Sequence, residues 1–214
     1  MSRLSDEFRR SLDSTAGTYQ KALGRSGRSY LNDRGITDQV IASYRLGQVD
    51  GSNDDHSMYT GMICLPYITK LGGVVALKFR QQHDCNQECS HSKYLTPYPT
   101  RIYNPLAFGR ADRQGLIGIT EGEIDAITLD GLCGIPAVGI PGVETWTKHR
   151  EWAELFRGYS KVIIFRDDDE PGERLAAAIT SDIDTAHVVR FPFKDANATY
   201  VALGANEVRR IAGV

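Results

Sequence analysis

Hydrophobic positions recur at helical spacing in the first part of the chain. Residues 5–22 predict an amphipathic helix whose apolar side chains lie near one face: Phe8, Leu12 and Tyr19. A second helix is predicted to begin after Thr37, a suitable N-cap residue, and to end near Gly47. Two apolar runs joined around residues 71–73 predict a β-hairpin. This part of the chain is therefore predicted to form a mixed α+β subdomain.

From Gly115 onwards the pattern changes to short apolar runs that alternate with helical stretches. The runs predict strands at residues 116–120, 136–140, 161–165 and 186–192. The stretches between them predict helices at roughly 123–132, 147–156 and 171–183. Strands that alternate with helices favour a parallel sheet covered on both faces. We therefore predict an α/β protein with an N-terminal α+β subdomain at 1–110 and a parallel-sheet sandwich at 111–214, which ends in a helical segment.

The composition is that of an ordinary soluble protein, with 41% hydrophobic and 24% charged residues among 214. No apolar stretch approaches the ~20 residues of a membrane span. The N-terminus, "MSRLSDEFRR", lacks the apolar core of a secretion signal. We therefore expect a cytoplasmic protein without membrane contact, in which the 4 cysteines are thiols or metal ligands.

The formal net charge of −2 hides an asymmetry between the two halves of the chain. Residues 1–110 carry 14 Lys/Arg and 10 Asp/Glu, a net of +4, whereas residues 111–214 carry 11 and 17, a net of −6. Such a division fits a metal site beside a surface that binds polyanions. It fits chance scatter of solvated charge nearly as well, so the charge alone does not decide the function.

Acidic residues follow the predicted strands of the second half. Glu121 comes directly after the first of these strands, and Asp167 and Asp169 come after the third. Because ligands bind beyond the carboxyl ends of parallel strands, these acids are predicted to meet at one edge of the sheet, together with Asp125 and Asp195. Carboxylate oxygens are the ligands that Mg²⁺ and Mn²⁺ prefer. The pattern therefore indicates a site for hard divalent cations.

The same acids have a simpler interpretation as helix caps. Asp169 or Glu170 before Pro171 fits an N-cap followed by proline at the first helical position. For any single acid, capping or solvation explains the residue as well as metal ligation does. The ordered set, one acid or pair after each of several strands, favours ligation.

Three segments around these acids resemble the Toprim domain of primases and topoisomerases: "ITEGEIDAITL", "IIFRDDDEPGERLAAA" and "PFKDANA". The likeness is greatest to DnaG-type primases and to the primase part of phage primase–helicases. The family pattern is Glu-Gly after the first strand, Asp-x-Asp after the third and a further acid after the fourth. Here Glu121, Asp167, Asp169 and Asp195 match it. The resemblance implies Mg²⁺ or Mn²⁺ at these acids and at Asp125, with Glu121, Asp167 and Asp169 as catalytic residues.

The first half resembles the segment that opens the RNA-polymerase core of DnaG-type primases, in "YLNDRGITDQVIASYRLGQV", "MICLPYITKLGGVVALKFR" and "SKYLTP". This resemblance implies a groove for template strand and incoming nucleotide, lined by basic residues: Lys78, Arg80, Lys93 and, as a looser match, Arg101. Such cations bind phosphates, and Tyr94 and Tyr103 are candidate rings for stacking on bases. The alternative is that the cations are solvated and the tyrosines belong to the core.

Cysteine and histidine gather in "HDCNQECSHSKY", which contains His83, Cys85, Cys89 and His91. Thiolate and imidazole are the ligands that zinc favours, and four of them complete a tetrahedral site. The spacing is tighter than in common zinc modules, so a metal-free polar loop is the alternative. Cys64 and Cys133 lie in apolar runs and are predicted to be small core residues.

The expected function is a primase catalytic core that makes short RNA primers on single-stranded DNA from ribonucleoside triphosphates. The resemblance to phage primase–helicases implies that it acts in the DNA replication of a bacteriophage. No Cys-x-x-Cys pair precedes Ser26 and no helicase phosphate-binding loop is present. We therefore expect a replicative helicase or a separate zinc-binding protein as a partner. The alternatives are a Toprim nuclease that uses the same acids, and a non-catalytic accessory protein that binds nucleic acid.

Overall fold

The structure, a computed structural model, describes residues 4–82 and 93–214 and divides into two compact units, Met1–Pro99 and Thr100–Val214. The observed boundary, between Pro99 and Thr100, lies earlier in the chain than the predicted boundary at 110/111. Tyr103 explains the difference, because its backbone N–H donates to the Gly139 carbonyl at 2.9 Å and its carbonyl accepts from Gly139 at 3.2 Å. The segment before residue 110 therefore belongs to the second unit.

The first unit contains an antiparallel sheet with the strands in chain order: β1 (Gly47–Gln48), β2 (Ile63–Ile68), β3 (Val74–Arg80) and β4 (Tyr94–Leu95). The predicted hairpin is confirmed, since β2 pairs with β3 from Ile63↔Arg80 onwards. Helix α1 (Asp6–Lys21) packs Leu12 and Tyr19 into a core with residues of this sheet. Phe8 is 41% exposed, so it does not share their buried face as predicted.

Shorter helices complete the first unit: α2 (Arg25–Asp33), α3 (Asp38–Ser43) and the 3₁₀ helix η1 (Asp54–Tyr59). The predicted cap of α3 is confirmed, because the Thr37 hydroxyl accepts a hydrogen bond from the Val40 N–H at 3.3 Å. The sequence pattern does not predict α2. The reason is that this helix buries only Gly27 and Leu31, too few apolar positions to show a periodicity.

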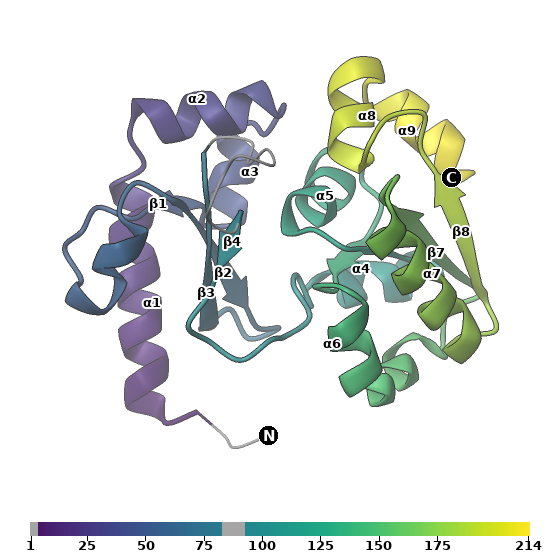
Figure 1. Ribbon diagram of the computed structural model, residues 1–214, viewed down its shortest axis with the longest axis horizontal. Helices are drawn as coiled ribbons and strands as arrows, with labels where there is room; N and C mark the ends of the chain where they lie inside the picture. The colour runs from purple at the N-terminus through teal and green to yellow at the C-terminus, as the bar shows by residue number, and fades with distance from the viewer. Residues whose placement is uncertain (1–3, 83–92) are drawn as a thin grey trace. The chain divides into compact units, whose positions relative to one another are not determined.

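The second unit is built on a parallel sheet in the order β6-β5-β7-β8; Figure 1 labels β7 and β8 of this sheet. Its strands are β5 (Leu116–Thr120), β6 (Ala137–Gly139), β7 (Lys161–Arg166) and β8 (Ala186–Arg190). All of the predicted strands are present, and the parallel pairing of β5 with β6 and β7 confirms the predicted sheet type. The strands are recognisable in sequence because a sheet buried on both faces needs nearly continuous apolar runs.

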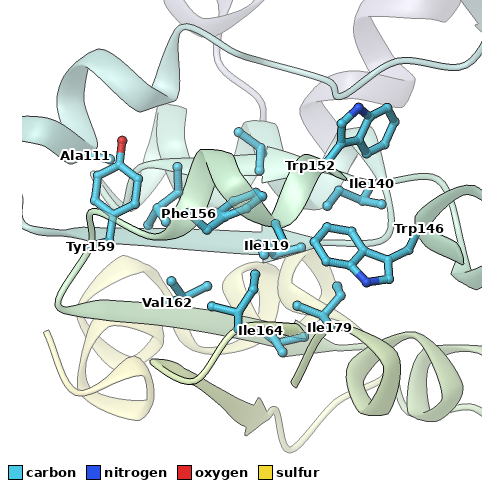
Figure 2. Close-up of a cluster of buried hydrophobic side chains, with 14 of the residues drawn as sticks. Ala111, Ile119, Ile140, Trp146, Trp152, Phe156, Tyr159, Val162, Ile164 and Ile179 are labelled. Atoms are coloured by element: carbon cyan, nitrogen blue, oxygen red, sulfur yellow. The ribbon is translucent and has the colours of Figure 1, made fainter. Parts of the chain in front are cut away.

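Alternate residues of the central strands face two hydrophobic cores. One core joins Ile119 and Ile164 to the helices on one face, and Figure 2 shows Trp146 and Ile179 packed around them. These helices are α4 (Ala107–Gln114), α6 (Val143–Lys148), η3 (Arg150–Phe156) and α7 (Glu170–Asp182). The other core joins Phe165 to residues of the opposite layer, which contains α8 (Ala196–Leu203) and α9 (Ala205–Ala212).

Two of the predicted helices differ in detail from the observed ones. The helix expected at 123–132 is an α-helix, α5 (Glu123–Ile127), that continues as a π-helical turn, η2 (Thr128–Leu132). The helix expected at 147–156 begins earlier, at Val143, and is interrupted at His149, whose φ of −131° and ψ of 45° are not helical. Such local changes leave no mark on apolar periodicity.

Cys64 and Cys133 are buried in the cores of the two units, as predicted. Burial raises the pKa of the Cys133 thiol to about 12, so this side chain behaves as a small apolar group at neutral pH. Among the described residues, no helix is both long enough and apolar enough to cross a membrane.

Candidate functional site

Acidic side chains gather where β5 and β7 end. The two strands are parallel neighbours, with Ile119 beside Ile164, so Glu121 and Asp167 leave the sheet at the same edge. The Asp168 N–H donates to the Lys194 carbonyl at 2.9 Å, which ties the loop after β7 to the residue before Asp195. The chain therefore brings together acids that are far apart in sequence.

Two of these acids are N-caps of helices. Asp169 Oδ1 accepts from the Gly172 N–H at 2.8 Å and begins α7, and Asp195 Oδ1 accepts from the Ala198 N–H at 2.7 Å and begins α8. The alternative interpretation of Asp169 as a cap is thus correct. It does not remove the other role, because each cap hydrogen bond uses one carboxylate oxygen and leaves Oδ2 available for a further ligand.

Asp125 lies on α5 and is nearly buried, at 7% exposure. Its Oδ1 accepts from the backbone N–H of Asn197 at 2.9 Å, and the Asn197 amide donates to the Thr128 hydroxyl at 2.9 Å. A Cβ at Gly122 would stand 2.7 Å from Asp125 Oδ2, so a side chain there would require the Asp125 carboxylate to shift. The glycine after Glu121 is therefore explained by the close approach of Asp125.

Asp167 is the electrostatic centre of this group. Burial, the largest cause, and four neighbouring carboxylates together raise the pKa of its carboxyl to about 8: Asp125, Asp195, Glu121 and Asp169. The acids that follow the strands therefore lie within electrostatic reach of one carboxyl group. As the side chains lie, no three histidine, cysteine, aspartate or glutamate residues in the described part of the chain converge on a single metal position.

The middle aspartate of the triplet, Asp168, does not join this group. Its side chain is 75% exposed and pairs with the guanidinium of Arg166 at 3.3 Å. Arg166 is nearly buried and also lies 3.7 Å from the Glu173 carboxylate. The arginine before the three aspartates therefore pairs with the outward-facing Asp168 and with Glu173 in the first turn of α7.

A second cluster, in the first unit, combines cations with tyrosine rings. The Lys78 ammonium lies 4.6 Å from the centroid of the Tyr94 ring and the Arg80 guanidinium 4.7 Å from it. Lys93 lies at 6.0 Å from the same ring. The structure therefore brings together three of the four basic residues that the resemblance to DnaG-type primases implies, all except Arg101. Contacts of this kind hold a cation in place against an aromatic ring.

Helix α2 adds two residues to this basic cluster that the sequence does not single out. The Tyr30 hydroxyl accepts a hydrogen bond from Arg80 Nε, and the Arg34 guanidinium lies 4.7 Å from the centroid of the Tyr30 ring. Their spacing of four residues, which places them on one helix face, was the available signal. Arg80 is 3% exposed, and its guanidinium lies 5.8 Å from the centroid of the Tyr30 ring and 4.7 Å from that of Tyr94.

Other predicted site residues lie elsewhere. Tyr103 is 1% exposed, so the prediction that its ring stacks on bases is wrong; its backbone extends the second unit's sheet instead. Arg101 belongs to the second unit, whereas Lys78, Arg80 and Lys93 belong to the first. The candidate zinc residues lie outside the described residues: His83, Cys85, Cys89 and His91.

Comparison with known proteins places the chain in a phage family. No known family profile matches the sequence. The Gene 57 protein of Mycobacterium phage D29 is 37% identical over 154 residues, which cover 69% of this chain and 95% of the phage protein. The chain belongs to the Gene 57 family. The region that this chain shares with the phage relative therefore spans nearly the whole length of that relative.

The fold of this Gene 57 family member matches solved primase domains. The RNA polymerase domain of Mycobacterium tuberculosis primase DnaG has a TM-score of 0.74 and 16% identity, and the match covers 98% of this chain and 84% of that domain. A DnaG primase catalytic domain bound to single-stranded DNA has a TM-score of 0.70 and 20% identity, covering 97% and 80%. The α/β architecture is thus that of a primase catalytic core.

Proposed function

We propose that the chain is a primase catalytic core, with a Toprim-type metal site, that joins ribonucleotides on a single-stranded DNA template during phage replication. The observation that carries this proposal is the group of carboxylates around Asp167 at the ends of β5 and β7. The primase fold supports it, as does the structure of one such domain bound to single-stranded DNA. A carboxylate group of this kind is costly without a cation, because like charges share a desolvated position.

The donor set fits a hard divalent cation. All of the candidate ligands are carboxylate oxygens, which suit Mg²⁺ or Mn²⁺ and not zinc. Glu121, Asp167 and Asp169 would hold the metal, and Asp125 and Asp195 would support them. Since no three of these side chains converge as they lie, we expect nucleotide phosphates to complete the coordination. Such a cation, when bound, stabilises the charge of the phosphates between which a nucleotide is transferred.

The residues of the chain have distinct tasks in this proposal. The pKa of Asp167 is raised to about 8, so its carboxyl holds a proton at neutral pH that a bound cation would displace. Asp169 and Asp195 keep their orientation because each caps a helix through Oδ1. Lys78, Arg80 and Lys93 would bind phosphates of template or nucleotide without reading the bases. A replicative helicase or a separate zinc-binding protein is the proposed partner for choosing the start site.

Incubation with labelled ribonucleoside triphosphates, single-stranded DNA and Mg²⁺ or Mn²⁺ tests the proposal. Short labelled oligoribonucleotides are the expected product. Asp167→Ala should lower their yield by at least about a hundredfold, because it removes the centre of the carboxylate group. Asp168→Ala is the matched control: it removes an exposed aspartate one residue away and should leave synthesis intact.

The other outcomes separate the alternatives. Shortening of the DNA without RNA products would indicate a nuclease that uses the same acids. DNA binding without either reaction would indicate an accessory protein. Full activity of Asp167→Ala would contradict the metal role of these residues.

A further inference from the structure

Strand β8 lies at the rim of the second unit's sheet, as Figure 1 shows. The opposite rim, at β6, is covered by the backbone pairing of Tyr103 with Gly139. In the part of the chain that the structure describes, β8 pairs with β7 alone. An edge strand with unpaired N–H and C=O groups is a template for another strand.

The direction of the free backbone groups follows from the register of β8. The Thr185 carbonyl accepts from the Val162 N–H at 3.2 Å, so residue 185 and alternate residues after it point toward β7. In a parallel ladder the residues between them point the other way. The N–H and C=O groups of Val188 and Arg190 therefore lie on the open side of the strand.

A groove runs beside this edge. Its volume is about 710 Å³, and it lies between β8 and the flank of α7, with these lining residues: Arg166, Glu173, Ala176, Ala177, Thr180, Ser181, Val188 and Arg190. The α7 residues in its wall beyond the first turn are all small. Val188 is 41% exposed although it belongs to a sheet strand. An apolar side chain from a neighbouring strand would fit beside Val188 under this helix flank.

The two ends of β8 carry opposite charges. Asp184 precedes the strand and Arg190 ends it, and both are exposed. Within the described residues, the side chain of neither residue forms an ion pair or a hydrogen bond, although the backbone of Arg190 pairs with β7. An antiparallel arrangement of two identical strands places unlike ends side by side, whereas a parallel arrangement places like ends together. The edge is therefore complementary to itself in one orientation only.

We propose that β8 pairs antiparallel with β8 of a second copy of this chain, about a two-fold axis at Val188. In this register Val188 faces Val188 of the second copy, and Arg190 faces Ala186. Asp184, which lies in the turn that the Ala186 N–H closes on the Ile183 carbonyl just before β8, is then at the same end of the pair as Arg190 of the second copy. The contact is isologous, so the ion pair occurs twice. The two parallel sheets join into one continuous sheet.

Sedimentation velocity of the full chain over a range of concentrations tests the proposal. We expect dimers to form at concentrations up to about 100 μM. Asp184→Arg and Arg190→Glu should each weaken dimerisation at least about tenfold, because each replaces two attractive contacts by two repulsive ones. The double variant should restore it. An equimolar mixture of the two single variants should also dimerise, since Arg190 of one chain then meets Asp184 of the other, and Arg at 184 meets Glu at 190.

A second measurement tests directly whether Val188 lies at the two-fold axis. Directly paired residues have Cα atoms about 5.5 Å apart, within the range that a disulfide spans. Val188→Cys should therefore give a disulfide-linked dimer under mild oxidation, whereas the unchanged chain, with its native cysteines, provides the background. Arg113→Glu, the same charge change at an exposed arginine on α4, is the control for the charge variants and should dimerise normally.

Two results would overturn the proposal: a monomer at every concentration, or a dimer that neither charge reversal weakens. Circular dichroism of each variant distinguishes loss of pairing from loss of folding. Oligomeric state is measured without any nucleotide, so the outcome is independent of primer synthesis.

Discussion

The carboxyl of Asp167 keeps its proton far above the pH at which an exposed aspartate loses it, with a pKa raised from 3.8 to about 8. Burial is the largest cause and the neighbouring carboxylates add to it. The unfolded chain releases this proton near pH 4, whereas the folded chain holds it to about pH 8. Folding is therefore favoured by this group below about pH 4, and that advantage is lost as the pH rises toward 8.

Asp167→Asn should remove this pH dependence. With divalent cations chelated, the free energy of unfolding of the unchanged protein should fall between pH 5 and pH 8 with a slope of at most about 1.4 kcal/mol per pH unit from this group. The variant should be flatter, because an amide has no proton to lose. Denaturant unfolding at several pH values measures the difference.

Asp168→Asn serves as the control for this comparison, because the Asp168 side chain is 75% exposed. It should keep the slope of the unchanged protein. Equal slopes for all three proteins would show that Asp167 is not the group responsible. Added Mg²⁺ should stabilise the unchanged protein more at pH 8 than at pH 6, since the metal competes with the proton.

At the scale of elements, helices α7 and α8 begin at acids of the candidate metal site. Asp169 and Asp195 each cap a helix with Oδ1, so folding of the helix fixes the direction in which Oδ2 points. The helix start and the metal position are thus set by the same side chain. A substitution that keeps the cap but removes the second oxygen separates the two roles.

Asp169→Ser and Asp169→Ala provide that separation. Serine is a good N-cap and alanine is not, so the alanine variant should be less stable than the serine variant by about 1 kcal/mol. Both should lose primer synthesis, because neither offers a carboxylate to the metal. Thermal or denaturant unfolding measures the first difference and the ribonucleotide assay the second. Full synthesis by Asp169→Ser would mean that the residue is a cap alone.

The sequence predicts elements where burial imposes a simple spacing. The strands of the second unit are apolar runs, and their order with helices indicates a parallel sheet whose carboxyl edge collects Glu121 and Asp167. It does not predict α2, the early start of α6, the π-helical turn, or the basic contacts of Tyr30 and Arg34. These depend on tertiary contacts that leave little trace in the apolar pattern; the four-residue spacing of Tyr30 and Arg34 was the one signal for their contacts. Tyr103 is the opposite case, in which the sequence suggests a role that the structure does not show. Its aromatic ring, close in sequence to basic residues, is a candidate for stacking on bases, but the structure buries it.

At the scale of the whole molecule, the chemistry is divided between the two units. Residues 1–99 carry 12 Lys/Arg and 10 Asp/Glu, a net of +2, and residues 100–214 carry 13 and 17, a net of −4. The cations with tyrosine contacts lie in the first and the grouped carboxylates in the second. On the proposed function, the first unit supplies phosphate binding and the second supplies the metal.

Lys78→Ala tests whether the first unit contributes phosphate binding. If Lys78 binds a phosphate, the variant should bind single-stranded DNA more weakly, and the slope of log affinity against log salt should become shallower by about 0.7. Fluorescence anisotropy with a labelled oligonucleotide at several salt concentrations measures both. Lys21→Ala, at the exposed end of α1, should leave the slope unchanged. An unchanged slope for Lys78→Ala would exclude a phosphate contact at that position.

The close packing at two glycines offers a way to find more distant relatives. A Cβ at Gly172 would stand 2.7 Å from the Asp167 carbonyl oxygen, as crowded as the approach of Asp125 to Gly122. Acids are abundant in any database of sequences, but a glycine fixed at a set interval from them is rare. A search with Glu-Gly-x-x-Asp followed by Asp-x-Asp-x-x-Gly should therefore separate true members from chance matches better than the acids alone.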